Sequence, residues 1–340
     1  MNRKFNVAVV GATGVVGEAM LSILDSRRFP VGEVHAVASS RSAGQRVPCG
    51  GRELEVEDLE NFDFDGIDIG LFSPGASVSA IHAPRAAAAG CVVIDNTSQF
   101  RYERDIPLVV PEVNPDAIAL YSNRNIIANP NCSTIQMVVA LKPIYDAAGI
   151  ERINVCTYQS VSGTGREAVE ELKQQTVALL NGRSANPSVY PKQIAFNVLP
   201  HIDVFQDNGY TKEEMKMVWE TRKIFGDETL RVNPTSVRVP VFCGHSEAVH
   251  VETRDKISAD EVRRLLRNQP GVVVMDERHD GGYPTAVTEA SGRDEVFVGR
   301  IREDISHPRG IDLWVVADNV RKGAALNSVQ IAEILVKHYL

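Results

Sequence analysis

The sequence lacks the long apolar segments of a membrane protein and the start of a secreted one. No apolar run approaches the roughly 18 residues that a membrane-spanning helix needs. The first residues lead directly into the apolar run 6–10, without a signal-like segment and cleavage site. We therefore expect a cytoplasmic protein with no membrane partner.

Cysteine is scarce, and basic residues are outnumbered by acidic ones. Five cysteines in 340 residues are an odd, sparse set that does not resemble a disulfide framework. No CxxC pair or Cys/His cluster has the spacing of a zinc site, so no metal is expected. Lys and Arg total 36 against 44 Asp and Glu, a net charge of −8 that argues against nucleic-acid binding.

The length suggests two domains, and the apolar pattern changes along the chain. In the first half, short apolar strands alternate with helical patterns, which is typical of a parallel sheet covered on both faces. The strands are expected at 7–10, 34–38, 68–72, 92–95 and 125–128, and the helices at 14–27 and 77–90.

The second half indicates a mixed, largely antiparallel sheet with helices over 168–180 and 211–225. A last helix, over 324–339, is expected to return to the first domain. The predicted fold class is α/β: a Rossmann-like domain plus an α+β domain. Its strands are expected at 153–160, 236–241, 247–253, 272–275, 296–301 and 311–317.

A glycine-rich turn, Gly11-Ala12-Thr13-Gly14-Val15-Val16-Gly17, follows the first strand and opens the first helix. Glycines in this context let backbone N–H groups approach a pyrophosphate at a helix N-terminus. The spacing is GxxGxxG and not GxGxxG, so the dinucleotide fingerprint is only partly met. The position favours nucleotide binding over the alternative, a tight turn without a ligand.

The second strand ends in Ser39-Ser40-Arg41-Ser42. NAD sites usually carry Asp or Glu here, for the ribose 2′-hydroxyl. Two hydroxyls and a guanidinium suit a 2′-phosphate instead, because arginine offers a charged bidentate fork. The segment predicts NADP as the cofactor, with a solvated polar loop as the alternative.

Cys132 has the sequence context of a nucleophile. It lies in Asn129-Pro130-Asn131-Cys132-Ser133-Thr134, between a strand and a helix expected over 133–148. The positive end of a helix dipole favours the thiolate form of a cysteine. The other cysteines lack this context, although Cys243 precedes Gly244-His245 and is expected to pack near the site. His245, between two strands, is the best-placed candidate for a proton relay.

Five motifs in order resemble the aspartate-β-semialdehyde dehydrogenase family over essentially the whole chain. They are the glycine turn 11–17, the cysteine segment 129–134, Gln159-Ser160-Val161-Ser162-Gly163-Thr164-Gly165, Arg238-Val239-Pro240-Val241 with Gly244-His245-Ser246, and Asp318-Asn319 with Gly323-Ala324-Ala325. The resemblance implies the reversible conversion of L-aspartyl 4-phosphate and NADPH to L-aspartate 4-semialdehyde, phosphate and NADP⁺. The reductive direction serves lysine, methionine and threonine biosynthesis.

The resemblance also implies residue roles. Cys132 resembles the nucleophile that forms a thioester, His245 the general acid/base, and Gln159 the residue that orients the intermediate. Arg238 resembles the anchor of the substrate carboxylate and Glu213 the partner of its ammonium group. Phosphate ligands are implied at Lys216, Arg101 and Asn131. Without the resemblance, Glu213 and Lys216 would be interpreted as an i,i+3 surface ion pair, and the two arginines as structural ion pairs.

Cofactor contacts and assembly follow from the same likeness. The implied NADP-binding domain spans 1–133 plus about 320–340, and the catalytic and dimerisation domain spans 134–319. Family members form dimers and sometimes tetramers, so a homodimer is expected, and the partners are otherwise small molecules. The implied NADP contacts are Gly11, Thr13, Gly14, Val15, Val16, Ser39, Ser40, Arg41, Ser73, Ser162, Gly163 and Asn319.

Two other interpretations fit the same plan. N-acetyl-γ-glutamyl-phosphate reductase uses similar acyl-phosphate chemistry, but its cysteine motif differs and its acetylated substrate has no ammonium group for Glu213. A catalytically idle NADP-binding paralogue is the alternative from another class. The presence of Cys132, Gln159, Arg238 and His245 together favours an active enzyme.

Overall fold

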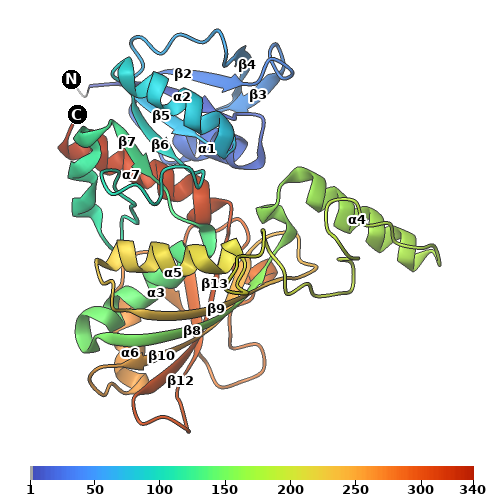
Figure 1. Cartoon of the computed structure of the whole chain (residues 1–340), viewed down its shortest axis with the longest axis vertical. Helices are drawn as coiled ribbons and strands as arrows, with labels where there is room; N and C mark the ends of the chain where they lie inside the picture. Colours follow the sequence, from blue (N-terminus) through green and yellow to red (C-terminus); the bar gives the residue numbers. More distant parts are fainter. Residues whose placement is uncertain (1–2) are drawn as a thin grey trace. The chain divides into compact units, whose positions relative to one another are not determined.

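The computed structural model describes residues 3–340, which form two compact units (Figure 1). The first unit comprises the described residues up to Asn131 together with 324–340, and the second comprises 132–323. Each unit is built on one β-sheet. Within residues 3–340, no helix is both long and apolar enough to span a bilayer.

The first unit has a seven-stranded sheet of order β3-β4-β2-β1-β5-β6-β7. All neighbouring strands are parallel except β3 and β4, which form an antiparallel pair. Three of the parallel strands are buried over their whole length, as expected for strands covered on both faces. The strands are β1 (Phe5–Val10), β2 (Val31–Ala38), β3 (Arg46–Cys49), β4 (Arg52–Asp58), β5 (Ile69–Phe72), β6 (Val92–Asp95) and β7 (Ile126–Ala128).

The β3–β4 hairpin was not predicted. Its strands carry charged residues on the exposed face, and only alternate positions such as Val47 and Val56 are buried. The local signal is the Gly50-Gly51 turn, where both residues have positive φ, 56° and 75°. Two successive positive φ values are what a two-residue hairpin turn requires.

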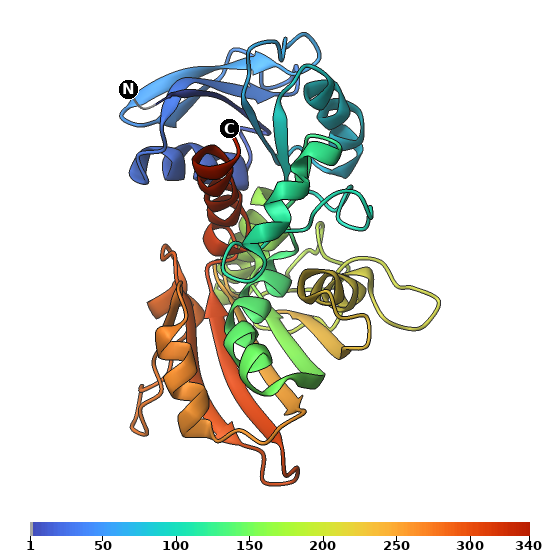
Figure 2. The same cartoon turned by 90° about the vertical axis from the view of Figure 1, so that its left-hand side faces the viewer.

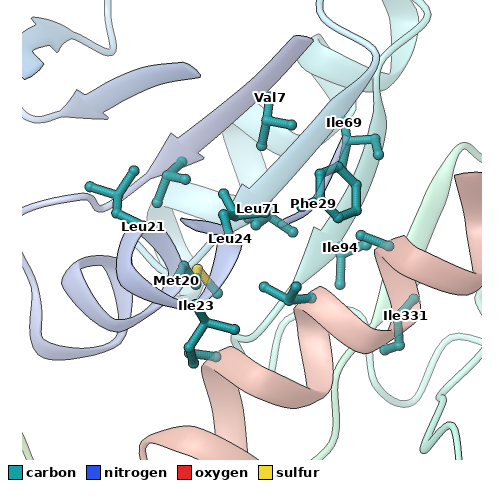
Figure 3. Packing of buried hydrophobic residues seen from close by; sticks show 14 of the residues in the cluster. Val7, Met20, Leu21, Ile23, Leu24, Phe29, Ile69, Leu71, Ile94 and Ile331 are labelled. Carbon is teal, nitrogen blue, oxygen red and sulfur yellow. The ribbon is translucent and has the colours of Figure 1, made fainter. Parts of the chain in front are cut away.

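Helices cover both faces of this first sheet. Helix α1 (Val15–Ser26) and the C-terminal α7 (Leu326–His338) pack on one face, and α2 (Ala76–Ala88) lies on the other (Figure 2). Apolar residues of α1 and α7 meet the sheet in one core, in which Ile331 lies near Ile94 (Figure 3). A 3-10 segment, Pro115–Asn123, contacts α7. This arrangement confirms the predicted Rossmann-like domain, including the return of the last helix.

The second unit has a six-stranded sheet of order β11-β12-β13-β10-β8-β9. The pairs β12–β13, β13–β10 and β10–β8 are antiparallel, whereas β11–β12 and β8–β9 are parallel. The predicted mixed, largely antiparallel sheet is therefore confirmed. The strands are β8 (Ile150–Gln159), β9 (Arg231–Arg238), β10 (His245–Thr253), β11 (Val272–Val274), β12 (Val296–Glu303) and β13 (Gly310–Ala317).

The second sheet has one fully buried face. Alternate residues of β8 and β10 are buried on that face, where α3 (Cys132–Ala148) runs along the strands (Figure 2). Helix α5 (Lys212–Phe225) lies against β9, and α6 (Ala259–Asn268) against β11 and β12. The remaining helical segments are α4 (Arg166–Leu180), the 3-10 turn Val161–Gly163 and the π turns Ala286–Ala290 and Arg321–Ala325.

Local sequence explains where these helices begin. Thr211 accepts a hydrogen bond from the Glu214 backbone N–H, and the Glu214 side chain accepts from the Thr211 N–H, so a capping box begins α5. Ser258 caps α6 through Glu261 in the same serine-to-acid spacing. Helix α6 was not predicted, although its capping serine is visible in the sequence. Strand β9 ends at Arg238, three residues before the predicted end and just ahead of Pro240.

Candidate active site

Three polar residues lie side by side where β8, β9 and β10 meet on the buried face of the second sheet. Gln159 pairs in register with Arg238, and His245 lies one step beyond the Ser246–Tyr158 pair, next to Gln159. All three are buried, with exposures of 1%, 5% and 0%. The structure therefore brings together three of the residues that the sequence singled out.

Cys132 is the first residue of α3 in the same unit. Its side chain is half-buried. Gly323 packs against it so closely that a Cβ at position 323 would lie 2.7 Å from the Cβ of Cys132. The glycine of the 323–325 motif thus has a steric reason to be a glycine. The helix N-terminus expected at this cysteine is present, one residue earlier than predicted.

The hydrogen bonds of His245 define its tautomer. The backbone N–H of Ser160 donates to Nδ1 of His245 at 3.0 Å, so Nδ1 is an acceptor and the neutral ring carries its proton on Nε2. Nε2 has no hydrogen-bond partner among residues 3–340. Burial, helped by the positive charge of Arg238, lowers the pKa of His245 to about 3. The imidazole is therefore neutral at physiological pH and presents an N–H.

Asn319 organises the loops around His245. Its side-chain oxygen accepts hydrogen bonds from the Ser160 and Ser162 hydroxyls and from the Gly244 N–H, at 2.9–3.1 Å. Its amide nitrogen donates to the Ser162 hydroxyl at 3.0 Å. The resemblance implied that Asn319 and Ser162 are cofactor contacts; in the structure their side chains support the loops on either side of the histidine.

Gly163 lies directly against the polar row. A Cβ at this position would come within 3.2 Å of Nη1 of Arg238 and 3.3 Å of Nε2 of His245. Nη1 of Arg238 donates to the Ser160 carbonyl at 2.7 Å, while its buried Nε has no partner among residues 3–340. A side chain at position 163 would therefore crowd the nitrogen atoms of both residues.

Glu213 and Lys216 extend the polar row into α5. One carboxylate oxygen of Glu213 accepts a bond from the Gln159 amide at 3.1 Å, and the other accepts from Lys216 at 2.8 Å. Lys216 also donates to Asp203 at 2.8 Å. Burial by itself would lower the pKa of Lys216, but Glu213 and Asp203 raise it to about 12. The i,i+3 ion pair of Glu213 and Lys216 is present, and Glu213 connects it to Gln159 of the polar row.

Arg101 and Asn131 belong to the first unit. Arg101 is buried and donates from Nε to the Asn129 carbonyl at 2.9 Å and from Nη2 to the Asn96 carbonyl at 2.7 Å. These bonds fasten the segment that leads into Cys132. Asn131, 7% exposed, directly precedes the cysteine.

The glycine turn of the first unit has the shape of a phosphate cradle. Gly11 has a φ of +88°, and a Cβ there would lie 2.7 Å from the Ser73 carbonyl oxygen. At Gly17 a Cβ would overlap the Gly11 carbonyl. Gly14 begins α1 without a side-chain cap. These are the close approaches that the dinucleotide turn requires.

The predicted 2′-phosphate residues lie on the same edge of the first sheet. Ser39, Ser40 and Arg41 directly follow β2 and are exposed. The Thr13 hydroxyl of the glycine turn donates to the Ser42 hydroxyl at 3.4 Å, which joins the two segments. The described residues contain no group of three or more His, Cys, Asp or Glu side chains arranged to hold a metal ion.

Two residues of the site were not predicted from the sequence: Ser160, whose backbone N–H orients His245, and Gly323, which packs against Cys132. Both lie inside the motifs 159–165 and 323–325, but local sequence does not reveal that residues 85 positions apart form a hydrogen bond.

Two family models match the chain and define its class. Residues 6–121 match "Semialdehyde dehydrogenase, NAD binding domain", and residues 141–322 match "Semialdehyde dehydrogenase, dimerisation domain". The chain therefore has the two domains of a nicotinamide-dinucleotide-dependent semialdehyde dehydrogenase.

Full-length relatives narrow the class. The chain is 62% identical to the aspartate-semialdehyde dehydrogenase of Shewanella violacea over 100% of both chains, and 50% identical to that of Bacillus subtilis over 99% of both. The crystal structure of aspartate semialdehyde dehydrogenase II from Vibrio cholerae complexed with ASA is 61% identical, covers 99% of this chain and 100% of its own, and has a TM-score of 0.98. The chain belongs to the aspartate-semialdehyde dehydrogenase family, which confirms the resemblance.

A more distant structure bears on the cofactor. The aspartate semialdehyde dehydrogenase of Candida albicans, solved with NADP, is 27% identical over 98% of both chains, with a TM-score of 0.77.

Proposed function

We propose that the chain catalyses the phosphate-dependent, reversible interconversion of L-aspartyl 4-phosphate and L-aspartate 4-semialdehyde, with NADP as cofactor. The cytoplasmic biosynthesis of lysine, methionine and threonine uses the reductive direction. The proposal rests on one observation. The second unit holds both Cys132, at the N-terminus of α3, and the buried row of Gln159, Arg238 and His245. The first unit would bind the dinucleotide and the second would perform the chemistry.

In the reductive direction, the Cys132 thiolate attacks the acyl carbon of aspartyl phosphate, the C–S bond forms, and phosphate leaves with the electron pair of the C–O bond. The nicotinamide, when bound, supplies the hydride that reduces the thioester. The thiohemiacetal oxyanion then re-forms the carbonyl and expels the Cys132 thiolate, which releases the aldehyde. The thiolate is regenerated without protonation of the oxyanion, and the one proton that the reduction consumes is taken up from solvent by the departing phosphate.

His245 fits the oxyanion of this sequence. Its neutral ring carries the proton on Nε2, because Nδ1 accepts the Ser160 N–H. We assign to Nε2–H a hydrogen bond to the thiohemiacetal oxygen, in the manner of an oxyanion hole. Gln159, held by Glu213 and Thr157, would orient the same intermediate.

The remaining polar residues match the charges of aspartyl phosphate. The buried, unpartnered Nε of Arg238 suits the substrate carboxylate, and Glu213 suits its ammonium group. Lys216, Arg101 and Asn131 would bind the phosphoryl group. An Arg101→Ala variant whose KM for phosphate rises no more than its KM for the semialdehyde would contradict this role.

Two features of the first unit suit the binding of NADP. The glycines at 11 and 17 leave room that a Cβ would fill, and the exposed guanidinium of Arg41 supplies the charge that a 2′-phosphate needs. Further contacts would come from Thr13, Val15, Val16, Ser39, Ser40, Ser73, Ser162, Gly163 and Asn319.

Removing the guanidinium of Arg41 should change the choice of cofactor. We expect Arg41→Ala to weaken NADP binding about tenfold and to leave NAD binding within about twofold, because only NADP carries the 2′-phosphate. Fluorescence titration with both cofactors measures the ratio. Arg46→Ala is the matched control, because Arg46 is an exposed arginine that pairs with Glu53. Equal weakening of NADP and NAD in the Arg41 variant would contradict the 2′-phosphate role.

We also propose a homodimer formed through the second unit. The face of its sheet opposite α3 is only half-buried and presents Tyr158, Ala248 and Trp314 beside a 300 Å³ cavity. Aromatic and apolar groups of this kind are typical of dimer interfaces. A monomer in sedimentation at micromolar concentration would contradict this assembly.

The activity itself is tested with purified protein, aspartate semialdehyde and NADP⁺, with and without phosphate. We expect sustained formation of reduced cofactor only with phosphate, and at most a stoichiometric burst without it, because the thioester then has no acceptor. No reduction in either case, with NADP binding intact, would favour the idle paralogue or the acetylglutamyl enzyme.

A further inference from the structure

Helix α4 carries two buried polar residues that the proposed reaction does not use. Glu171 and Gln175 lie one turn apart on this helix, and their exposures are 4% and 3%. The loop 181–199 runs back beside the helix (Figure 1). A buried carboxylate needs hydrogen-bond donors, and the donors here come from this loop.

Both side chains bind backbone N–H groups of the loop. The Glu171 carboxylate accepts hydrogen bonds from the N–H groups of residues 188–190 and, at 2.6 Å, from the Ser188 hydroxyl. The Gln175 side-chain oxygen accepts from the N–H groups of residues 194 and 195, at 3.0 and 3.2 Å. Its amide nitrogen donates to Glu171 at 3.1 Å. These two side chains, here called the α4 clamp, fix the loop over residues 188–195.

The α4 clamp holds Tyr190 against the polar row. The Tyr190 side chain is buried, and its hydroxyl lies 2.9 Å from that of Thr164, which follows Gly163 in the turn beside Arg238. The guanidinium carbon Cζ of Arg238 lies over the Tyr190 ring, 6.0 Å from its centroid. At this distance the face of an aromatic ring still attracts a guanidinium.

The same loop also holds the backbone of Arg238. The N–H of Leu199 donates to the Arg238 carbonyl at 2.9 Å, and the N–H of Arg238 donates to the Leu199 carbonyl at 2.8 Å. Leu199 and Tyr190 share a small hydrophobic cluster with Leu172 of α4. The loop therefore contacts Arg238 at both its backbone and its side chain.

This contact matters because a guanidinium binds a carboxylate best in its own plane. Nη1 of Arg238 already donates to the Ser160 carbonyl at 2.7 Å. The Tyr190 ring lies on one face of the same group. Together the two contacts restrict rotation of the guanidinium, so its buried Nε keeps one direction toward a bound carboxylate.

We propose that Tyr190, held by the α4 clamp, is a positioning residue that orients Arg238 and so sets the affinity for the substrate carboxylate. The inference rests on the role proposed for Arg238. Since the proposed phosphate ligands are other residues, the affinity for phosphate should not depend on Tyr190.

Replacing the ring should separate the two substrates. For Tyr190→Leu we expect the KM for the semialdehyde to rise at least about fivefold, with kcat and the KM for phosphate within about twofold. Tyr190→Phe keeps the ring and should recover most of the loss. Tyr145→Leu is the matched control, because Tyr145 lies near the far end of α3 from Cys132 and its hydroxyl donates to Asp227 at 2.9 Å. It should lose stability and keep both KM values.

A double substitution tests whether Tyr190 acts through Arg238. In an Arg238→Met protein, Tyr190→Leu should change the KM for the semialdehyde by less than about twofold, because no guanidinium remains to be oriented. An equal rise in both backgrounds would overturn the proposal. An unchanged KM in Arg238→Met alone would instead contradict the carboxylate role of Arg238.

Chemical labelling tests the same contact without turnover. Phenylglyoxal modifies accessible arginines, and mass spectrometry measures its reaction with Arg238, which is 5% exposed. We expect Tyr190→Leu to raise this rate at least about threefold, because the guanidinium is more often accessible. Glu171→Gln should raise it too and should also raise the KM for the semialdehyde, since an amide lacks the second acceptor oxygen that the loop uses. Wild-type labelling of Arg238, or a wild-type KM for the semialdehyde, in folded Tyr190→Leu protein would overturn the proposal; if that variant does not fold, the same results in Glu171→Gln would do so.

Discussion

Replacing Cys132 by alanine should reduce turnover to the background rate, a loss of at least about 10⁴-fold, while NADP still binds. The proposed thioester forms on the sulfur of this residue alone, and alanine offers no leaving group for the collapse of the thiohemiacetal. The burst expected without phosphate should disappear as well. Rapid-mixing absorbance of the reduced cofactor measures both effects in one experiment.

Cys91→Ala is the matched control for this substitution. Cys91 is a fully buried free cysteine directly before β6, and burial raises the pKa of its thiol. A buried thiol of this kind is unreactive, so its loss should leave kcat unchanged. Turnover retained by Cys132→Ala, or abolished equally by Cys91→Ala, would remove Cys132 from the role of nucleophile.

Strong local patterns explain how much of the fold could be predicted from the sequence. The buried strands 92–95 and 126–128 are apolar except for Asp95, and the structure has them within a residue of the prediction. The hairpin at 46–58 and helix α6 were missed because many of their residues are charged, and tertiary packing decides their structure. Pairing order, β11-β12-β13-β10-β8-β9, is a long-range property with no local signal.

The candidate site also combines features that a local sequence pattern predicts with features that only long-range strand pairing produces. Cys132 and the glycine turn were visible because a strand, a turn and a helix follow one another in the sequence. Gln159, Arg238 and His245 share one row only because β8 pairs with both β9 and β10. The role of Ser160 depends on a backbone N–H, which any residue other than proline supplies, so no residue type could reveal it.

The second large loss of activity is expected at His245, whose neutral ring carries its proton on Nε2. His245→Ala removes the Nε2–H donor from the thiohemiacetal oxygen, and we expect kcat to fall about 10²–10³-fold with a smaller change in KM, the usual cost of one oxyanion donor. His245→Gln keeps an N–H and should recover part of the loss. His279→Gln, at an exposed histidine paired with Glu277, should have no effect on kcat. Wild-type kcat in His245→Ala would contradict the assignment.

The pH dependence of folding tests the same residue without substrate. His245 is neutral in the folded protein above about pH 3, whereas an unfolded histidine takes up a proton below about 6.5. The unfolded state therefore binds more protons between these values, and wild-type stability falls as the pH drops through this window. His245→Gln lacks this titration, so its unfolding free energy should improve relative to the wild type from pH 7 to pH 5. A difference that stays constant over this range would show that His245 is not held neutral, and the oxyanion role that depends on its Nε2–H would fall with it.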